Sequence, residues 1–377
     1  MSENIIIKTD CFFYEGSKPC AFHKKDGRLC NNCEDYKRIE SRILIVKLDA
    51  LGDVLRTTSI LPALKKKYPN SHITWITKER ALPILKSISL INRVFCVERN
   101  FIEYILNETF DVGICLDSDS YSSSILSIAS CKNKYGFIAD KSGNPVPVHE
   151  NGREWWLMGL NDKLKRDNRK TYQEIIHTIC NLQYEKHHPL IGESIINENL
   201  IDKFINENGI SRGEKIIGIN TGGGNRWEWK KWILDYYCQF ISLIKSKYPE
   251  FQIILFGGPE EIDFNKEIIA KVGNLVIDAG CHNTLEEFIS KVKLSDIFLT
   301  SDSLGFHIAS ALKIKSLVLV GPTSPWELEV YDNGEIIYPD IECLSCYLNK
   351  CNKVPNCMQM ITPTKVFAKF ELWMNLK

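Results

Sequence analysis

The chain has 377 residues, with 47 basic and 47 acidic side chains, so its formal net charge is zero. That balance excludes a global positive field that would steer the protein onto nucleic acid. A composition of 44% hydrophobic and 25% charged residues is typical of a globular protein and excludes disorder as the main state. At about 150 residues per domain, the length predicts two domains with additional segments.

The N-terminal segment carries a short apolar run, three isoleucines at 5–7, with acidic residues on both sides. This pattern is unlike a secretory signal or a transit peptide. No stretch approaches the roughly 18 apolar residues of a membrane span. We therefore expect a cytoplasmic protein, and peripheral contact with the inner face of the membrane stays open.

Cysteine is the one residue type with an unusually high count, 14 residues. Eight of the cysteines form two closely spaced groups. Four thiols are the number that a closed tetrahedral zinc or iron site needs, and a metal could supply the folding energy that short loops lack. We expect structural zinc or iron at each group, with His23 as a spare ligand and disulfides or free thiols as the alternative. The groups are Cys11, Cys20, Cys30 and Cys33, and Cys343, Cys346, Cys351 and Cys357.

Beyond a polar, cysteine-marked flap at 1–40, short apolar strands alternate with segments of helical spacing. The first half has predicted strands at 42–48, 72–77, 93–98 and 111–117, with a helix after the first strand that ends at Pro69. Such alternation predicts an α/β domain with a parallel sheet.

Residues 140–210 are less regular, with a candidate helix at 174–181, and the alternation then begins again. Strands are predicted at 215–221, 251–258, 274–280, 296–302 and 316–325, with helices at 232–247 and from 285 and 303. The fold class is therefore α/β with two doubly wound sheets in tandem. We divide the chain into segments 1–40, 41–200, 201–335 and 336–377.

Polar residues follow the first strand, where ligands collect in α/β sheets. Asp49 and Asp53 lie in and just after a turn, and Gly52 between them permits a close approach. A carboxylate at this place could take a proton from a substrate hydroxyl. Capping of the following helix explains Asp53 equally well.

The first strand of the second half ends in a loop with three consecutive glycines at 222–224, followed by Arg226, Lys230 and Lys231. Glycines and cations together suit an anion, although a solvated loop is the alternative, and no Rossmann or P-loop motif is present. Glu260 follows the next strand and could accept from ribose hydroxyls, although acidic residues also favour a helix N-terminus on their own.

A further loop precedes the predicted helix from Ser303. Asp302 or Ser301 can cap this helix, and the N–H groups of its first turn, 303–306, suit a diphosphate. His307 lies one turn from Ser303 on the same face. A lone histidine on an amphipathic helix is more often a core residue.

The four motifs together resemble the heptosyltransferase-like glycosyltransferases of family 9, over about residues 41–370. The resemblance implies a GT-B fold, in which two Rossmann-like domains face a cleft. It implies an acceptor site in the N-terminal domain, a nucleotide-sugar site in the C-terminal domain and a last helix that crosses back to the first domain. It also implies inverting transfer of heptose from ADP-heptose without a catalytic metal, and related autotransporter heptosyltransferases carry iron at a C-terminal finger.

The resemblance also implies individual roles. Asp53 is the expected general base, and the acidic run at 117–120 is expected to be a strand-end loop. Leu304 stands where many members have glycine, and Gly305 follows it. The expected donor and phosphate residues are Thr221, Gly222, Gly223, Lys230, Lys231, Asp302, Ser303, Leu304, Gly305 and His307. The expected nucleoside residues are Glu260, Asn283, Thr284 and Leu285.

The sequence thus predicts a glycosyltransferase whose acceptor is a lipopolysaccharide, another surface or lipid-linked glycan, a protein hydroxyl or a small molecule. One alternative is a metal-dependent or iron–sulfur regulatory protein that binds a nucleotide on the same scaffold. Another is a family 9 enzyme that uses a different nucleotide sugar. No nucleic-acid partner is expected, and the oligomeric state stays open.

Overall fold

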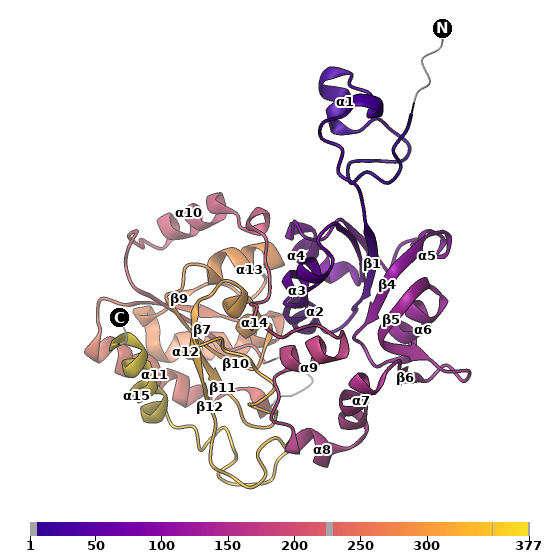
Figure 1. The fold of residues 1–377 in the computed structure, drawn as a ribbon. Coiled ribbons are helices and arrows are strands. Elements are labelled where there is room, and N and C mark those ends of the chain that lie inside the picture. The colour runs from indigo at the N-terminus through magenta and orange to yellow at the C-terminus, as the bar shows by residue number, and fades with distance from the viewer. Residues whose placement is uncertain (1–5, 224–228, 349, 376–377) are drawn as a thin grey trace.

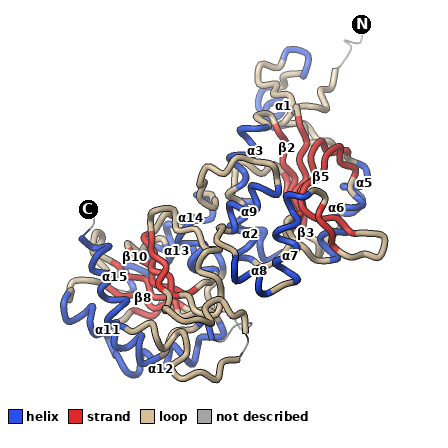
Figure 2. Tube along the Cα trace, turned by 60° about the horizontal axis from the view of Figure 1, so that its bottom comes forward, coloured by secondary structure: helices blue, strands red, loops and turns tan. Residues whose placement is uncertain are grey.

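The computed structural model describes residues 6–223, 229–348 and 350–375. Two halves of the chain each form a six-stranded sheet, and Figure 2 shows the strands as two separate groups with helices around each. The alternation of strands and helices in the sequence therefore predicted the α/β class correctly.

The first sheet has the order β3-β2-β1-β4-β5-β6, parallel except for β6, which runs antiparallel to β5. Ile43, Leu44, Ile45 and Val46 of the central strand β1 are fully buried, as a parallel strand covered on both faces requires. The strands are β1 (Ser41–Val46), β2 (Ser71–Thr77), β3 (Arg93–Cys96), β4 (Thr109–Cys115), β5 (Ser130–Ala139) and β6 (Pro145–Pro147).

The helices of this half lie between and after its strands. They are α2 (Leu51–Thr57), α3 (Ile60–Lys67), α4 (Leu82–Ser87), α5 (Ile102–Asn107), α6 (Ser120–Ile128), α7 (Arg153–Leu160), α8 (Asp162–Asp167) and α9 (Tyr172–Ile179), and α10 (Glu198–Glu207) precedes the second sheet.

The single helix predicted after β1 is two helices, α2 and α3. At the break, Thr58 donates its hydroxyl to the carbonyl of Leu55 at 2.6 Å, and Ser59 donates to Arg56 at 2.9 Å. Hydroxyl groups that bond to the preceding turn compete with the helical pattern, which the apolar spacing does not reveal.

The second sheet has the order β12-β11-β10-β7-β8-β9, and its paired strands are parallel. Its strands are β7 (Ile216–Asn220), β8 (Gln252–Phe256), β9 (Ile277–Asp278), β10 (Ile297–Ser301), β11 (Lys315–Leu319) and β12 (Gly334–Ile337). Its helices are α11 (Leu234–Lys247), α12 (Ile262–Val272), α13 (Leu285–Val292), α14 (Leu304–Ala311) and α15 (Pro363–Asn375).

The last helix does not follow the expectation that it crosses back to the first domain. Helix α15 packs against α11 and β11, and Figure 1 shows it beside α11. Val366 and Phe370 are fully buried in one apolar cluster with Phe240 and Phe251 of the second domain. The aromatic face of α15 therefore completes the core of its own domain, and the predicted crossover is wrong.

The N-terminal segment up to Glu40 stands apart from both sheets (Figure 1). It contains one short helix, α1 (Ala21–Asp26), and none of its described residues is buried. Across all the described ranges, no helix is long and apolar enough to cross a membrane.

Candidate active site

The carboxyl ends of the two sheets meet at a cavity of about 450 Å³. The start of α2 and the neighbouring α8 supply one wall, while α14 and the loops after β11 supply the other. The lining residues are Ala50, Leu51, Gly52, Asp53, Arg56 and Lys165 from the first half, and Lys230, Asp302, Ser303, Leu304, His307, Thr323, Ser324, Glu327, Leu328 and Tyr347 from the second.

Asp53 lies in the first turn of α2 and points into this cavity. One of its oxygens accepts from the backbone N–H of Ala50 at 3.3 Å, and the other lies 2.8 Å from the guanidinium of Arg56. The carboxylate is one-third exposed. Asp53 therefore caps its helix, as the alternative interpretation held, and also presents a charged oxygen to the cavity.

The surrounding cations keep Asp53 ionised. Burial alone would raise the pKa of its carboxyl, but the positive charges of Arg56 and Lys47 outweigh burial and hold the pKa below its ordinary value. Arg56 itself lies 3.7 Å from the ring centre of Tyr172, and its buried Nε finds no acceptor among the described residues. Arg56 is thus a fixed cation beside the carboxylate, and its Nε–H makes no hydrogen bond within the described residues.

Glycine at position 52 is required by the contact between the two domains. A Cβ atom there would lie 2.7 Å from Cδ2 of His307, which is closer than real Cβ contacts allow. His307 is almost fully buried against this glycine, and burial together with the charge of Arg56 lowers its pKa to about 4. The imidazole is therefore neutral near pH 7.

Asp302 and Lys230 form an ion pair at one corner of the cavity. The ammonium of Lys230 lies 2.7 Å from Asp302 Oδ2, which also accepts from the hydroxyl of Thr323 at 2.9 Å. Burial opposes ionisation of Asp302, but Lys230 and its other neighbours hold its pKa far below the ordinary value. The pair places one lysine ammonium at the cavity wall with its position fixed.

Helix α14 begins beside this corner. Ser303 is its N-cap residue, so the expectation that Asp302 or Ser301 caps the helix is wrong. The Ser303 hydroxyl lies 3.0 Å from that of Thr300 and accepts from Nδ2 of Asn220 at 3.2 Å. Because a Cβ on Gly305 would lie 2.8 Å from that Nδ2, only glycine lets Asn220 approach the first turn.

A second cavity, of about 480 Å³, lies on the other side of the same helix end. Its wall includes the strand-end glycines, Glu260 and the start of α13. Ser303 and Leu304 line both cavities, so the two spaces meet at the N-terminus of α14. The expected residues that line this second cavity are Gly222, Gly223, Glu260, Asn283, Thr284, Leu285, Ser303, Leu304 and Gly305.

Hydrogen bonds fix the start of α13 at this cavity. Asn283 donates to the carbonyl of Gly280 at 2.7 Å and accepts from Lys291 at 2.6 Å. Thr284 caps the helix, and Glu287 returns a carboxylate to its N–H at 2.8 Å. The loop before α13 is therefore a fixed wall.

Two residues expected at the donor site lie elsewhere, and one further cation of the glycine-rich loop lies outside the described residues. The Thr221 hydroxyl is buried 2.6 Å from Asn265 Oδ1, and Lys231 lies 2.7 Å from the buried carboxylate of Glu261. Neither residue lines the two cavities. Arg226 falls outside the described residues.

Four charged or aromatic residues of this lining were not singled out from the sequence: Arg56, Lys165, Glu327 and Tyr347. Arg56 follows Asp53 by one helical turn, a spacing that could have revealed it. Tyr347 donates to Glu327 Oε1 at 2.9 Å, and the Lys165 ammonium lies 3.9 Å from the Tyr347 ring centre. No local pattern connects these three, because they come from distant parts of the chain.

The other acidic residues near β1 have structural partners. Asp49 pairs with Lys78 and Arg80, and Asp117 pairs with the buried ammonium of Lys47. Asp119 caps α6 by accepting from two backbone N–H groups at 2.9 Å. The run at 117–120 is thus a strand-end loop with internal bonds, as expected.

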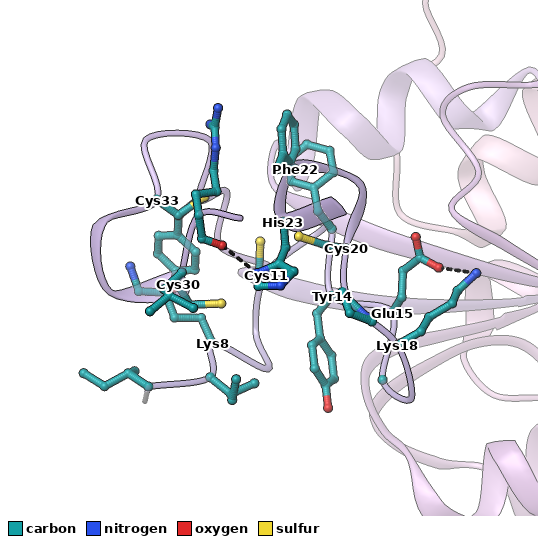
Figure 3. Close-up of a pocket in the computed structure, with 18 of the residues that line it drawn as sticks. Lys8, Cys11, Tyr14, Glu15, Lys18, Cys20, Phe22, His23, Cys30 and Cys33 are labelled. Atoms are coloured by element: carbon teal, nitrogen blue, oxygen red, sulfur yellow. Dashed lines mark hydrogen bonds and ion pairs between the residues drawn. The ribbon is translucent and has the colours of Figure 1, made fainter. Parts of the chain in front are cut away.

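The two cysteine groups differ in their surroundings. Cys11, Cys20, Cys30 and Cys33 line a third cavity together with His23 (Figure 3). Cys357 packs beneath Gly321, where a Cβ would lie 2.6 Å from its sulfur. Within the described ranges, no three histidine, cysteine or acidic side chains stand close enough together to hold a metal ion.

The chain belongs to glycosyltransferase family 9 (heptosyltransferase), whose sequence profile matches residues 99–355. It is 30% identical to lipooligosaccharide heptosyltransferase 2 of Campylobacter jejuni over 179 residues, and these aligned residues make up 45% of this chain. The match spans 54% of that relative, about half its length.

Solved structures show the same fold. The glycosyl transferase family 9 protein from Veillonella parvula matches with a TM-score of 0.68 and 16% identity over 89% of this chain and 97% of its own. The E. coli ADP-heptose lps heptosyltransferase II matches with a TM-score of 0.63 and 18% identity over 88% and 98%. The GT-B fold implied by the motifs is therefore confirmed.

Proposed function

We propose that this protein is an inverting glycosyltransferase that transfers heptose from ADP-heptose to an acceptor hydroxyl. One observation carries the proposal: two cavities meet at the N-terminus of α14, and Asp53 faces that junction from the other domain. A nucleoside diphosphate sugar has three parts that match this arrangement: a nucleoside for one cavity, a sugar for the other and a diphosphate for the helix N-terminus between them. The names of the relatives point to heptose as the sugar and ADP-heptose as the donor.

The donor would lie across the helix end. The nucleoside occupies the cavity beside Glu260 and Asn283, and the diphosphate sits at the first turn of α14, where free N–H groups and the helix dipole favour negative charge. Lys230 adds a cation on the same side. The sugar then enters the cavity that Asp53, Glu327 and Tyr347 line.

Asp53 acts as the general base. Its ionised oxygen takes the proton of the acceptor hydroxyl as that oxygen attacks the anomeric carbon. The negative charge that builds on the leaving diphosphate is stabilised by Lys230 and the N–H groups of α14. These groups perform the electrostatic work that a metal ion performs in other transferases, so we propose that the chemistry is metal-independent.

Arg56 also takes part. It lines the same cavity, and its guanidinium lies 2.8 Å from Asp53, so its fixed positive charge would hold the carboxylate in place and attract an oxygen of the acceptor or of the sugar. We propose that the acceptor belongs to a lipopolysaccharide, another glycan or a protein, and that the enzyme works in the cytoplasm.

The test is mass spectrometry of reactions that contain one nucleotide sugar each. Both anomers of ADP-heptose, a UDP-hexose and a GDP-hexose are offered with a panel of glycan and peptide acceptors. The proposal expects a product heavier by one heptose residue from one ADP-heptose anomer. Equal transfer or equal hydrolysis of all the nucleotide sugars would contradict it.

A further inference from the structure

The segment from Ile6 to Glu40 has no apolar core of its own. None of its described residues is buried, and its regular structure is limited to α1 and one helical turn at Cys30–Asn32. Segments of about this size do not fold on apolar burial alone and need disulfides, metals or a partner surface.

The rest of the protein provides little support for this segment. Glu40 donates its N–H to the carbonyl of Asn70 at 2.9 Å, and the ring of Phe12 lies 6.3 Å from that of His72. Both partners lie at or just before the start of β2, at the amino ends of the strands and thus on the opposite edge from Asp53. Figure 1 shows the segment projecting from this edge.

The backbone closes the segment into a loop with the cysteines inside. Cys11 pairs with Arg38 in a β-bridge, and Phe12 and Ile39 donate to Lys37 and Asp10 at 2.9 and 2.7 Å. Gly27 ends α1 with a φ of 75°, a conformation that returns the chain toward Cys30. Four thiols that lie far apart in the sequence are thereby brought around one space.

That space is a cavity of about 500 Å³, lined by all four thiols. Figure 3 shows the sulfur atoms and the ring of His23 at its walls, each cysteine being half-buried. His23 Nδ1 lies 2.9 Å from the carbonyl oxygen of Arg28, a bond that orients the ring. The four cysteines alone provide a complete tetrahedral set for a thiophilic metal.

We propose that Cys11, Cys20, Cys30 and Cys33 bind one divalent zinc or iron ion, which supplies the missing core of the N-terminal segment. Each thiol loses its proton to solvent as its sulfur binds the metal. Since no three of the described side chains already stand at ligating distance, the cavity contracts around the ion, and binding orders the segment. This site lies apart from the transfer chemistry, at the opposite edge of the sheet.

Protection from alkylation tests the site in the unmodified full chain. Purified protein is treated with iodoacetamide before and after a strong chelator, and the modified peptides are mapped by mass spectrometry. We expect the four cysteines to be protected until the chelator is added, while half-buried Cys238 on α11 reacts equally in both samples. Reaction of the four before chelation, or disulfide-linked peptides among them, would overturn the proposal.

Metal analysis of variants identifies the ligands. Cys30→Ser with Cys33→Ser should lose one metal equivalent per chain, and amide exchange should rise in residues 8–40 but not in β1 and β4. His23→Ala should keep the metal. The C-terminal pair Cys343→Ser with Cys346→Ser is the matched control, which keeps the N-terminal equivalent. Three results would each overturn the proposed site. They are unchanged metal content in Cys30→Ser with Cys33→Ser, loss of metal in His23→Ala, and stoichiometric labile sulfide bound by the N-terminal cysteines.

Discussion

Neighbouring lysines at 230 and 231 have separate partners, although the sequence could not distinguish them. Lys230 pairs with Asp302 at the wall of the cavity that Asp53 also lines, the transfer cavity, while Lys231 pairs with buried Glu261 and lies outside that cavity. The directions of two consecutive side chains at the end of an irregular loop cannot be predicted from the sequence, because neither the strand period nor the helix period applies there.

We predict that Lys230→Ala lowers donor turnover by about 10²–10³-fold, because it removes a cation from the developing diphosphate charge. Lys231→Ala is the matched control. It should lower the melting temperature by leaving Glu261 buried and unpaired, with much less effect on turnover per folded enzyme. Steady-state kinetics and thermal unfolding measure the two effects, and a larger kinetic loss in Lys231→Ala would show that Lys231 is the phosphate contact.

His307 makes the stability of the fold depend on pH. Its pKa falls from 6.5 in the unfolded chain to about 4 in the folded protein, so between these values the unfolded state binds more protons. The free energy of unfolding should therefore decrease as the pH falls from 6.5 to 4, by on the order of 3 kcal/mol from this residue.

Denaturant unfolding of wild type and His307→Asn at pH 7 and at pH 4.5 measures this contribution. The variant should show a shallower loss of stability over that interval. His72, whose pKa burial also lowers to about 4, provides a second variant, His72→Asn, in strand β2 of the first sheet. Identical pH dependence in wild type and His307→Asn would exclude the proposed role of burial.

At the scale of elements, the loop at 343–348, which carries two of the C-terminal cysteines, contributes to the transfer cavity. Ser345 and Tyr347 donate their backbone N–H groups to Gly321 and Pro322 at 3.3 and 2.9 Å, so this loop lies alongside the loop after β11. The Tyr347 hydroxyl accepts from the N–H of Ser324 at 3.2 Å and donates to Glu327. The loop at 343–348 thereby helps to fix the wall where we place the sugar.

Tyr347→Phe should raise the KM for the nucleotide sugar about tenfold, because the hydrogen bond that holds Glu327 is lost. Binding of the free nucleoside diphosphate should change little, since the nucleoside cavity does not include Tyr347. Tyr338→Phe is the control, because this exposed tyrosine lies outside the transfer cavity. An equal KM in wild type and Tyr347→Phe would show that the loop at 343–348 takes no part in the sugar site.

Much of the element order was predictable, because buried parallel strands leave short apolar runs such as that of β1. Strand β5 was not predicted, since its polar residues, among them Lys132 and Asn133, lie on exposed positions and give no apolar run. The contacts between distant segments were also beyond the sequence pattern. Glu327 and Tyr347 meet Lys165 only through the packing of both halves of the chain.

At the scale of the whole molecule, the two halves are complementary. The second half presents the helix N-terminus and a lysine for the anionic leaving group, while the first half presents an ionised carboxylate across the cavity. The contact between Gly52 and His307 brings these groups to the same space without room for a larger residue. We therefore propose that the donor site and the general base belong to different domains.

The most direct test of that claim compares transfer and donor binding in Asp53→Ala. The variant should lose transfer by about 10²–10⁴-fold, because no base takes the proton of the acceptor hydroxyl. Calorimetric binding of ADP or of the donor should remain close to that of wild type, since Asp53 lies outside the nucleoside cavity. Unchanged turnover in Asp53→Ala, or loss of donor binding together with loss of transfer, would contradict the assignment of the base to the first domain and the donor to the second.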